Sequence, residues 1–195
     1  EQELSTVLAL FPQPSIQSAK GNIGLAVQLR GKWRPGGYKK PALSASGQIS
    51  LHNLDLALVK SPVVFSDLQG EFLFNDQDLA ITSFTGKAGS TDFELSGLFK
   101  NIINYLASPE QPIKIEARLY SKHLHMEELL RSASPAQQDS DRASGYRFSI
   151  APQLSLNLDC QIDRVDFDRF RGTNLQGRLE VNNAQARLED VRLGV

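Results

Sequence analysis

Apolar and polar residues alternate over long stretches of this chain, and this alternation constrains the fold more than any other feature. A period of two places every second side chain on the same face of a β-strand. In the segment 21–31 the shared apolar face consists of Ile23, Leu25, Val27 and Leu29. The same pattern recurs in the segments 47–58, 78–84, 91–99, 112–121 and 152–170. The chain is therefore predicted to be mainly β, with one apolar face.

The details of the pattern predict how the strands turn and bend. In the segment 47–58 the parity of the apolar residues shifts at His52-Asn53, which is typical of a β-bulge or a corner. Asn-Asp and Asn-Asn pairs at 75–76 and 182–183 favour tight hairpins. We expect an elongated, twisted antiparallel β-sheet. A few short helices are predicted in the segments 3–11, 101–108 and 126–133, which prolines follow.

A faint internal repeat, offset by 107 positions, predicts how the chain is organised. Segment 66–89 resembles segment 173–195, and Leu68-Gln69-Gly70 recurs as Leu175-Gln176-Gly177. We interpret the chain as a single fragment of a larger repetitive protein. A first β unit is expected at 20–130 and a second, truncated unit at 146–195. A polar, flexible loop is expected between them, at 132–145.

Composition and motifs argue against several classes of function. The chain has 195 residues and a formal net charge of -1, so no overall field attracts nucleic acid. Cys160 is the only cysteine, which excludes an internal disulfide. No nucleophile elbow, phosphate-binding loop or dinucleotide fingerprint is present. We therefore expect a protein that is not an enzyme and has no cofactor.

The histidines were considered as metal ligands. His123 and His125 form an H-x-H pair that shares one face of a strand, with Glu127 and Glu128 just beyond. Zinc needs three or four converging ligands, and His52 is the only other histidine. We therefore predict polar, solvent-facing strand positions and no metal site. The acidic segments 75–78 and 166–168 are likewise expected to form a turn and a solvated strand face.

A basic, aromatic segment at 30–40 is a candidate interfacial loop. Cations that flank aromatic rings suit a lipid headgroup region or a nucleic-acid strand, and the neutral chain disfavours the second. The alternative is an ordinary soluble hairpin loop around Pro35-Gly36-Gly37. The candidate residues are Arg30, Lys32, Trp33, Arg34, Tyr38, Lys39 and Lys40.

Four segments of the chain carry a family resemblance: ASGQISLHNLDLAL (45–58), FSDLQGEFLFND (65–76), GKAGSTDFELSGLF (86–99) and IEARLYSKHLHMEELL (115–130). Together they resemble the AsmA-like family of Gram-negative envelope proteins. The resemblance covers most of 20–130 and restarts near 150, whereas 132–145 departs from the family pattern. It implies a long periplasmic protein with β repeats, anchored to the inner membrane through segments outside this fragment.

The resemblance also implies a function in outer-membrane lipid homeostasis, with phospholipid or another envelope lipid carried along an apolar groove. A curved sheet lined with apolar side chains shelters acyl chains at about 0.8 kcal/mol per buried methylene. The candidate lining residues are Ile49, Leu51, Leu54, Leu56, Phe72, Phe74, Ile81, Phe93, Leu95, Ile113, Ile115, Leu156 and Leu158.

Two other functions fit the same alternation. A closed β-sandwich would hide the apolar face in its core and act as a structural or interaction module of the cell envelope. Its exposed edge strands would pair with partners, and such an edge would also allow the fragment to dimerise. A carbohydrate- or envelope-binding module is a third and weaker possibility.

Overall fold

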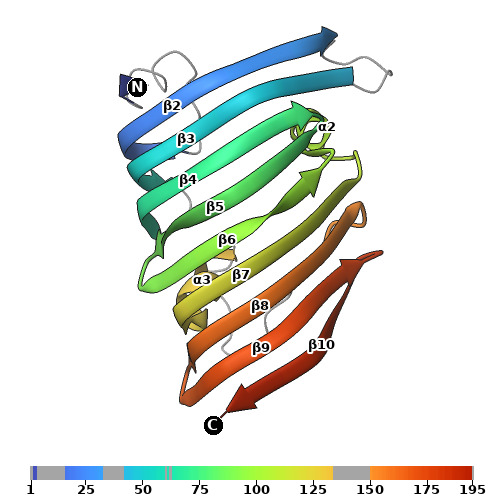
Figure 1. Cartoon of the computed structure of the whole chain (residues 1–195). Helices are drawn as coiled ribbons and strands as arrows, with labels where there is room; N and C mark the ends of the chain where they lie inside the picture. Colours follow the sequence, from blue (N-terminus) through green and yellow to red (C-terminus); the bar gives the residue numbers. More distant parts are fainter. Residues whose placement is uncertain are drawn as a thin grey trace.

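The computed structural model describes residues 2–3, 16–32, 42–59, 61, 63–133 and 150–194. These residues form one mainly β fold, in which a single sheet carries two short helices at its sides (Figure 1). The elements are β1 (Gln2–Glu3), β2 (Ile16–Lys32), β3 (Ala42–Leu58), β4 (Val64–Asp76), β5 (Asp78–Ala88), β6 (Thr91–Lys100), α2 (Ile102–Ala107), β7 (Ile113–His125), α3 (Met126–Ala133), β8 (Leu154–Phe167), β9 (Phe170–Asn182) and β10 (Gln185–Gly194).

The strands lie in the sheet in the order of the sequence, from β1 to β10, and the sheet does not close on itself. Neighbouring strands are antiparallel, as predicted, except for β7 and β8, which pair in parallel. The parallel pairing places the predicted first and second units in one continuous sheet. A closed β-sandwich would need a second sheet, and the described strands form only one.

Tight hairpins connect several strands. Asp76, at the β4–β5 turn, has a positive φ, as do Asn183 and Ala184 at the β9–β10 turn, and both turns lie where Asn-Asp and Asn-Asn pairs predicted hairpins. The predicted strand at 152–170 is wrong in its length. It ends at Phe167, and Asp168, with φ of 54°, turns the chain into β9. Asn and Asp tolerate the left-handed conformation because their side chains are short and polar.

A line of bulges bends the long strands along one side of the sheet. Asn53, at the predicted parity shift, has φ of 49° and lies at a register shift between β3 and β4. Asp67 of β4, Asn174 of β9 and Asp190 of β10 also have positive φ values near 50°. Bulges bend a strand and increase its twist. Asp67 and Asn174 precede the repeated Leu-Gln-Gly, so the internal repeat corresponds to a repeated bend.

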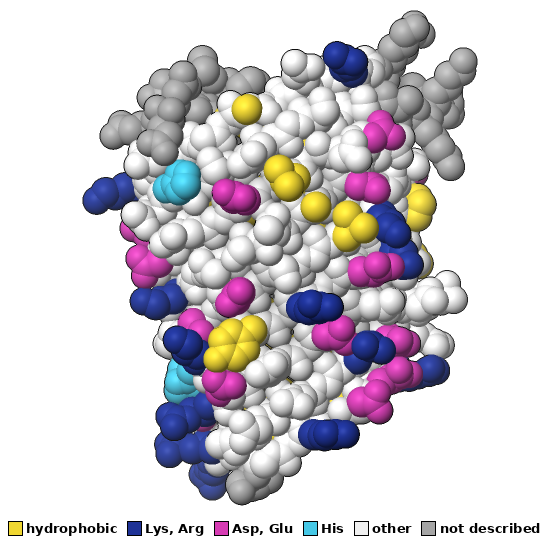
Figure 2. All heavy atoms as spheres, in the orientation of Figure 1, with side chains coloured by type: hydrophobic (Ala, Val, Ile, Leu, Met, Phe, Trp, Pro, Cys, Tyr) yellow, Lys and Arg dark blue, Asp and Glu magenta, His cyan; other side chains and the backbone are white. Residues whose placement is uncertain are grey.

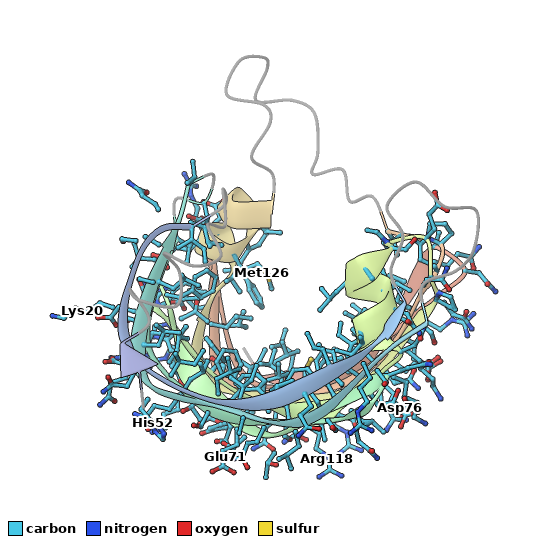
Figure 3. The ribbon with its side chains drawn as sticks, turned by 90° about the horizontal axis from the view of Figure 1, so that it is seen from above. Lys20, His52, Glu71, Asp76, Arg118 and Met126 are labelled. Atoms are coloured by element: carbon cyan, nitrogen blue, oxygen red, sulfur yellow. The ribbon has the colours of Figure 1, made fainter. Side chains whose placement is uncertain are left out.

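The bent strands give the sheet a U-shaped cross-section with two chemically different faces (Figure 3). Lys20, His52, Glu71 and Arg118 point outward from the convex face. Figure 2 shows charged side chains of both signs scattered over the convex face, with a few apolar ones between them. Met126 lies on the concave side, which is lined by the opposite set of side chains. The apolar face of the sequence is therefore the concave face.

The two helices flank the concave face. Residues 102–107 and 126–133 form α2 and α3 and confirm two of the predicted helices. In α3, Met126 and Leu129 pack on the buried cluster of Leu124, Ile162 and Val165. α2 lies inside the opposite arm of the U (Figure 3). Neither of these helices, the two in the described residues, is long and apolar enough to cross a membrane.

Some sequence predictions fall outside the described residues. They are the helix at 3–11, except Glu3, which belongs to β1, the turn at 35–37, and the flexible loop from 134 to 145. The first two residues of that predicted loop, 132–133, instead belong to α3.

Candidate functional site

The concave face is a candidate binding groove because strand pairing aligns its apolar residues into continuous rows. Residues paired across a sheet point to the same face. The three rows at the floor run across the strands from β2 to β9 or β10. They are Leu25–Ile49–Phe72–Ile81–Gly97–Ala117–Leu158–Leu179–Leu188, Ile23–Leu51–Gly70–Phe84–Leu95–Leu119–Cys160–Gly177 and Val27–Gly47–Phe74–Leu79–Phe99–Ile115–Leu156–Val181–Ala186.

The rows contain no charged and no amide side chain. Their residues alternate along each strand with those of the convex face, many of which are polar, such as Glu71 between Gly70 and Phe72. Strands spaced about 4.8 Å apart give the β2–β10 floor a length of about 38 Å. The groove is therefore uniformly apolar along its whole floor.

Nine of the thirteen predicted lining residues lie in these rows. The structure places them on one face, half-buried except for Ile81, which is buried. They are Ile49, Leu51, Phe72, Phe74, Ile81, Leu95, Ile115, Leu156 and Leu158. The sequence therefore predicted the orientation of the floor residues.

The other four predicted residues lie nearer the walls. Leu54 is buried with Leu68 at the bend, and Leu56 and Phe93 pack against that pair. Ile113 is buried at the start of β7. Leu54 and Ile113 stabilise the bend and the sheet, and little of their surface remains for a ligand, whereas Leu56 and Phe93 are half-buried like the floor residues.

An aromatic chain connects the floor to the bent wall. Phe84 contacts Phe72 edge-on with ring centroids 5.3 Å apart, and contacts Phe93 in the same way at 5.1 Å. Such edge-to-face pairs stabilise a structure by about 0.5–1.5 kcal/mol beyond the area they bury. Phe84 was not among the predicted lining residues, although it belongs to the repeat that the sequence showed.

Other floor residues were also missed. The three floor rows contain further residues that were not predicted to line the groove, among them Leu25, Leu119, Leu179 and Leu188. The sequence pattern could have predicted Leu25, because apolar residues alternate clearly with polar or small ones along its strand. For Leu188 the signal was weaker, because charged residues surround it in β10. The groove therefore extends further toward both edges of the sheet than predicted.

The candidate interfacial loop is described only at its start. Arg30 is exposed near the end of β2, where its guanidinium donates a 3.4 Å hydrogen bond to the side chain of Gln28. The backbone of Lys32 ends the strand. The remaining candidates, Trp33, Arg34, Tyr38, Lys39 and Lys40, lie outside the described residues.

Cys160 lies in the floor, in line with Leu119. Burial, with a smaller contribution from the Asp159 carboxylate, raises the pKa of its thiol. The thiolate is the reactive form, so folding lowers the reactive fraction at a given pH. We expect iodoacetamide at about pH 8 to alkylate Cys160 more slowly in the folded chain than in urea, as measured by mass spectrometry. Equal rates in both states would contradict this assignment.

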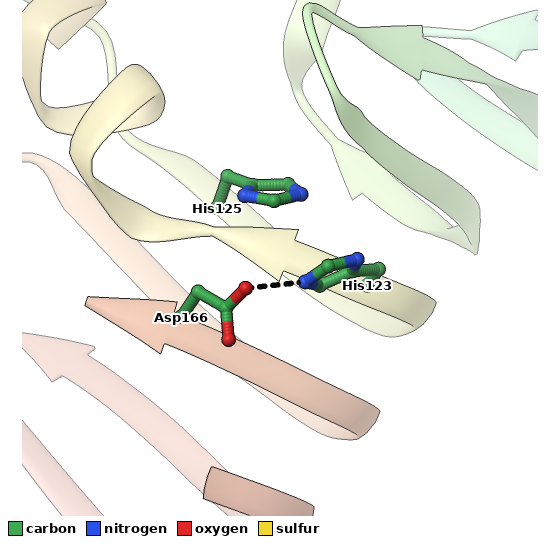
Figure 4. A group of neighbouring side chains, drawn as sticks. All are labelled: His123, His125 and Asp166. Atoms are coloured by element: carbon green, nitrogen blue, oxygen red, sulfur yellow. Dashed lines mark hydrogen bonds and ion pairs between the residues drawn. The ribbon is translucent and has the colours of Figure 1, made fainter. Parts of the chain in front are cut away.

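A cluster of three polar side chains (Figure 4) lies on the bent wall, on the face opposite to the buried Leu124 and therefore on its outside. His123 and His125 of β7 are half-buried there, and Asp166 of β8 lies beside them. The sequence predicted solvent-facing positions for these histidines and no metal site. Asp166 was not predicted beside them because 41 residues separate it from His125. No local signal would have predicted the parallel pairing that brings the two together.

Comparison with protein-family models, with curated proteins and with solved structures finds no match to this chain.

Proposed function

We propose that the concave groove binds the acyl chains of a phospholipid or another envelope lipid and conducts them along its length. The protein is then a non-enzymatic segment of an AsmA-like, membrane-associated protein in the periplasm of a Gram-negative bacterium, in keeping with the resemblance of its strands to that family. The observation that carries the proposal is the uninterrupted apolar floor across β2–β10.

Exposed apolar side chains within the groove support this function. Leu25 is 58% exposed, Leu29 is 73% exposed and Leu188 is 70% exposed, and all three belong to the concave face. Leaving apolar area in water costs about 25 cal/mol per Å². These leucines lie toward the two ends of the floor, and the half-buried rows between them join them into one apolar surface. A contiguous apolar surface of this kind marks a binding site in soluble proteins. An acyl chain would cover it.

The dimensions and the chemistry of the two faces also fit. One leaflet of a bilayer contributes about 15 Å of hydrocarbon, so a floor of about 38 Å is longer than one acyl chain. The mixed charges of the convex face keep that face in water (Figure 2). The open side of the U would leave a polar headgroup in solvent while the acyl chains lie on the floor.

The test is lipid capture by the chain purified without detergent from a Gram-negative host. Native mass spectrometry should detect phospholipid adducts that organic extraction removes. Size-exclusion chromatography of the same sample separates lipid binding from association of copies through their edge strands. A lipid-free mass, together with no uptake of fluorescent phospholipid from vesicles, would overturn the proposal.

Charge substitutions locate the binding surface. Leu158→Asp places a carboxylate within the row that runs from Leu25 to Leu188, and Leu25→Asp combined with Leu188→Asp places one at each end of that row. Covering an unpaired charge with an acyl chain costs several kcal/mol, so we expect lipid binding to fall about tenfold or more. The control is Leu73→Asp, which adds the same charge at an exposed leucine of the convex face.

The control variant should bind lipid as the original chain does. Circular dichroism confirms folding, and the Leu25/Leu188 pair gives a result even if Leu158→Asp does not fold, because both leucines are already exposed. Equal losses in Leu73→Asp and in the groove variants would show that the apolar floor is not the binding surface.

A further inference from the structure

We propose that His123, His125 and Asp166 form a binding site for a divalent transition-metal ion such as Zn²⁺, on the convex side of the bent wall. One ligand atom from each of these side chains lies within 4.8 Å of the others. The Nε2 atom of His123 is 2.7 Å from Oδ2 of Asp166, and the centroids of the two imidazole rings are 3.9 Å apart (Figure 4). Small rotations of the side chains would bring all three onto one ion.

The backbone positions the three residues for this purpose. His123 and His125 are two residues apart on β7, which places both rings on the same face. In the parallel pairing with β8, His125 is directly opposite Asp166. Leu124, between the histidines, is buried on the opposite side against Ile162 and Val165. That packing holds both rings on the outside of the wall.

Side chains of β6 clamp the same stretch of backbone. The backbone pairing of β6 with β7 ends at Tyr120, and side chains of β6 bond to the backbone of β7 beyond it. Asp92 Oδ1 accepts a hydrogen bond from the N–H of His123 at 2.8 Å, and Thr91 Oγ1 accepts one from the N–H of His125 at 2.9 Å. Partial burial acts to raise the pKa of Asp92, but its bonds to backbone N–H groups outweigh this and lower it. The bonds from Asp92 and Thr91 therefore hold the H-x-H backbone in place.

One carboxylate oxygen of Asp166 is also placed to bind a cation. Its Oδ1 atom is buried and has no hydrogen-bond partner among the described residues. A buried carboxylate oxygen without a partner costs free energy, and a bound cation would satisfy it. The side chains of His123 and Asp166 are still 32% and 30% exposed, so an ion has access from solvent.

The ligand set selects the class of metal. Two imidazoles and a carboxylate suit Zn²⁺, Co²⁺ and Ni²⁺, whereas Mg²⁺ and Ca²⁺ require mostly oxygen ligands. Three protein ligands leave a coordination position for water or an anion. A cavity of about 420 Å³ beside Asp166 is lined by Arg164 and Arg171, which would attract an anion to that position. The same arginines repel a cation, so we expect weaker binding than in a closed four-ligand site.

Isothermal titration of the full chain with Zn²⁺ tests the site. The protein must carry no histidine tag and must first be dialysed against a chelator. We expect one Zn²⁺ per chain and no binding of Mg²⁺. His125→Asn and Asp166→Asn should each weaken Zn²⁺ binding by about tenfold or more. Replacing even a residue that only hydrogen-bonds to a metal ligand lowers metal affinity about 10–100-fold. His52→Asn, at the third histidine of the chain, is the matched control and should bind as the original chain does.

A Co²⁺ spectrum gives an independent readout. Co²⁺ bound to two imidazoles and a carboxylate should give visible absorption bands that disappear in His125→Asn and persist in His52→Asn. These bands decide the question if Asp166→Asn does not fold. No Zn²⁺ binding by the original chain, or binding that His125→Asn leaves unchanged, would overturn the proposal.

Discussion

Replacing Leu68 with alanine is expected to lower the free energy of unfolding by about 2–5 kcal/mol. Leu68 is only 4% exposed, and with Leu54 it forms the buried centre of the bend. Phe84 and Phe93 pack against this pair. Removing the side chain leaves a cavity between strands that the bulges at Asn53 and Asp67 already constrain, so the surroundings have little freedom to close it. Urea denaturation followed by circular dichroism measures the loss.

The matched control for this substitution is on the same strand. Leu73 is 42% exposed on the convex face of β4, and Leu73→Ala should change the free energy of unfolding by no more than about 0.5 kcal/mol. If both variants lost the same free energy, the cluster of Leu54 and Leu68 would not be the centre of the bend.

Replacing Gly47 with alanine is expected to lower the free energy of unfolding by about 2 kcal/mol or more. Gly47 lies in the groove floor between Val27 and Phe74, with φ of +128°, a conformation that residues with a side chain rarely adopt. A methyl group there would also overlap the backbone carbonyl oxygen of Ala26. Because that oxygen belongs to the paired strand β2, relief of the overlap would separate β2 from β3. A thermal melt and a urea titration measure the effect.

Gly24 provides the comparison for Gly47. A methyl group at Gly24 would meet only the hydroxyl of Ser50, a side-chain group that can rotate away, and its φ is not in the positive range. Gly24→Ala should therefore leave the free energy of unfolding nearly unchanged. A Gly47→Ala variant as stable as Gly24→Ala would show that this register of β2 and β3 is wrong.

Both predictions concern how the groove is shaped. Leu68 stabilises the bend that turns a long sheet into a U, and Gly47 allows β2 and β3 to approach closely at the floor. A chain that loses either would expose the apolar rows differently. Lipid capture by these variants should therefore fall together with stability, unlike in Leu25→Asp/Leu188→Asp, where only binding should fall.

Much of the fold follows from local sequence. Alternation predicted the mainly β class and the face on which the floor residues lie, because strand geometry forces every second side chain to the same side. The parity shift at His52-Asn53 predicted the bulge, since Asn adopts positive φ at low cost. The length of the strand at 152–170 was wrong because Asp168-Arg169 is a weaker turn signal than Asn-Gly or Asp-Gly.

The candidate sites differ in how far local sequence predicts them. The groove is built from one face of many neighbouring strands, so its lining residues repeat a pattern that each strand shows separately. The wall residues Leu54 and Phe93 have the same pattern as the floor residues Ile49 and Leu95. Only the bend, which packs the first pair at the buried cluster of Leu54 and Leu68, places these two residues in the wall.

The sequence by itself determined most of the strands, their apolar face and the bulge at His52-Asn53, because these depend on side-chain alternation. Only the structure showed that the internal repeat corresponds to a repeated bend at Asp67 and Asn174. Only the tertiary structure decided the parallel pairing of β7 with β8, which depends on the path of the chain between them. That pairing places Asp166 beside His123 and His125. A metal site on two strands is a property of their register, and register between distant strands is set by packing across the whole sheet.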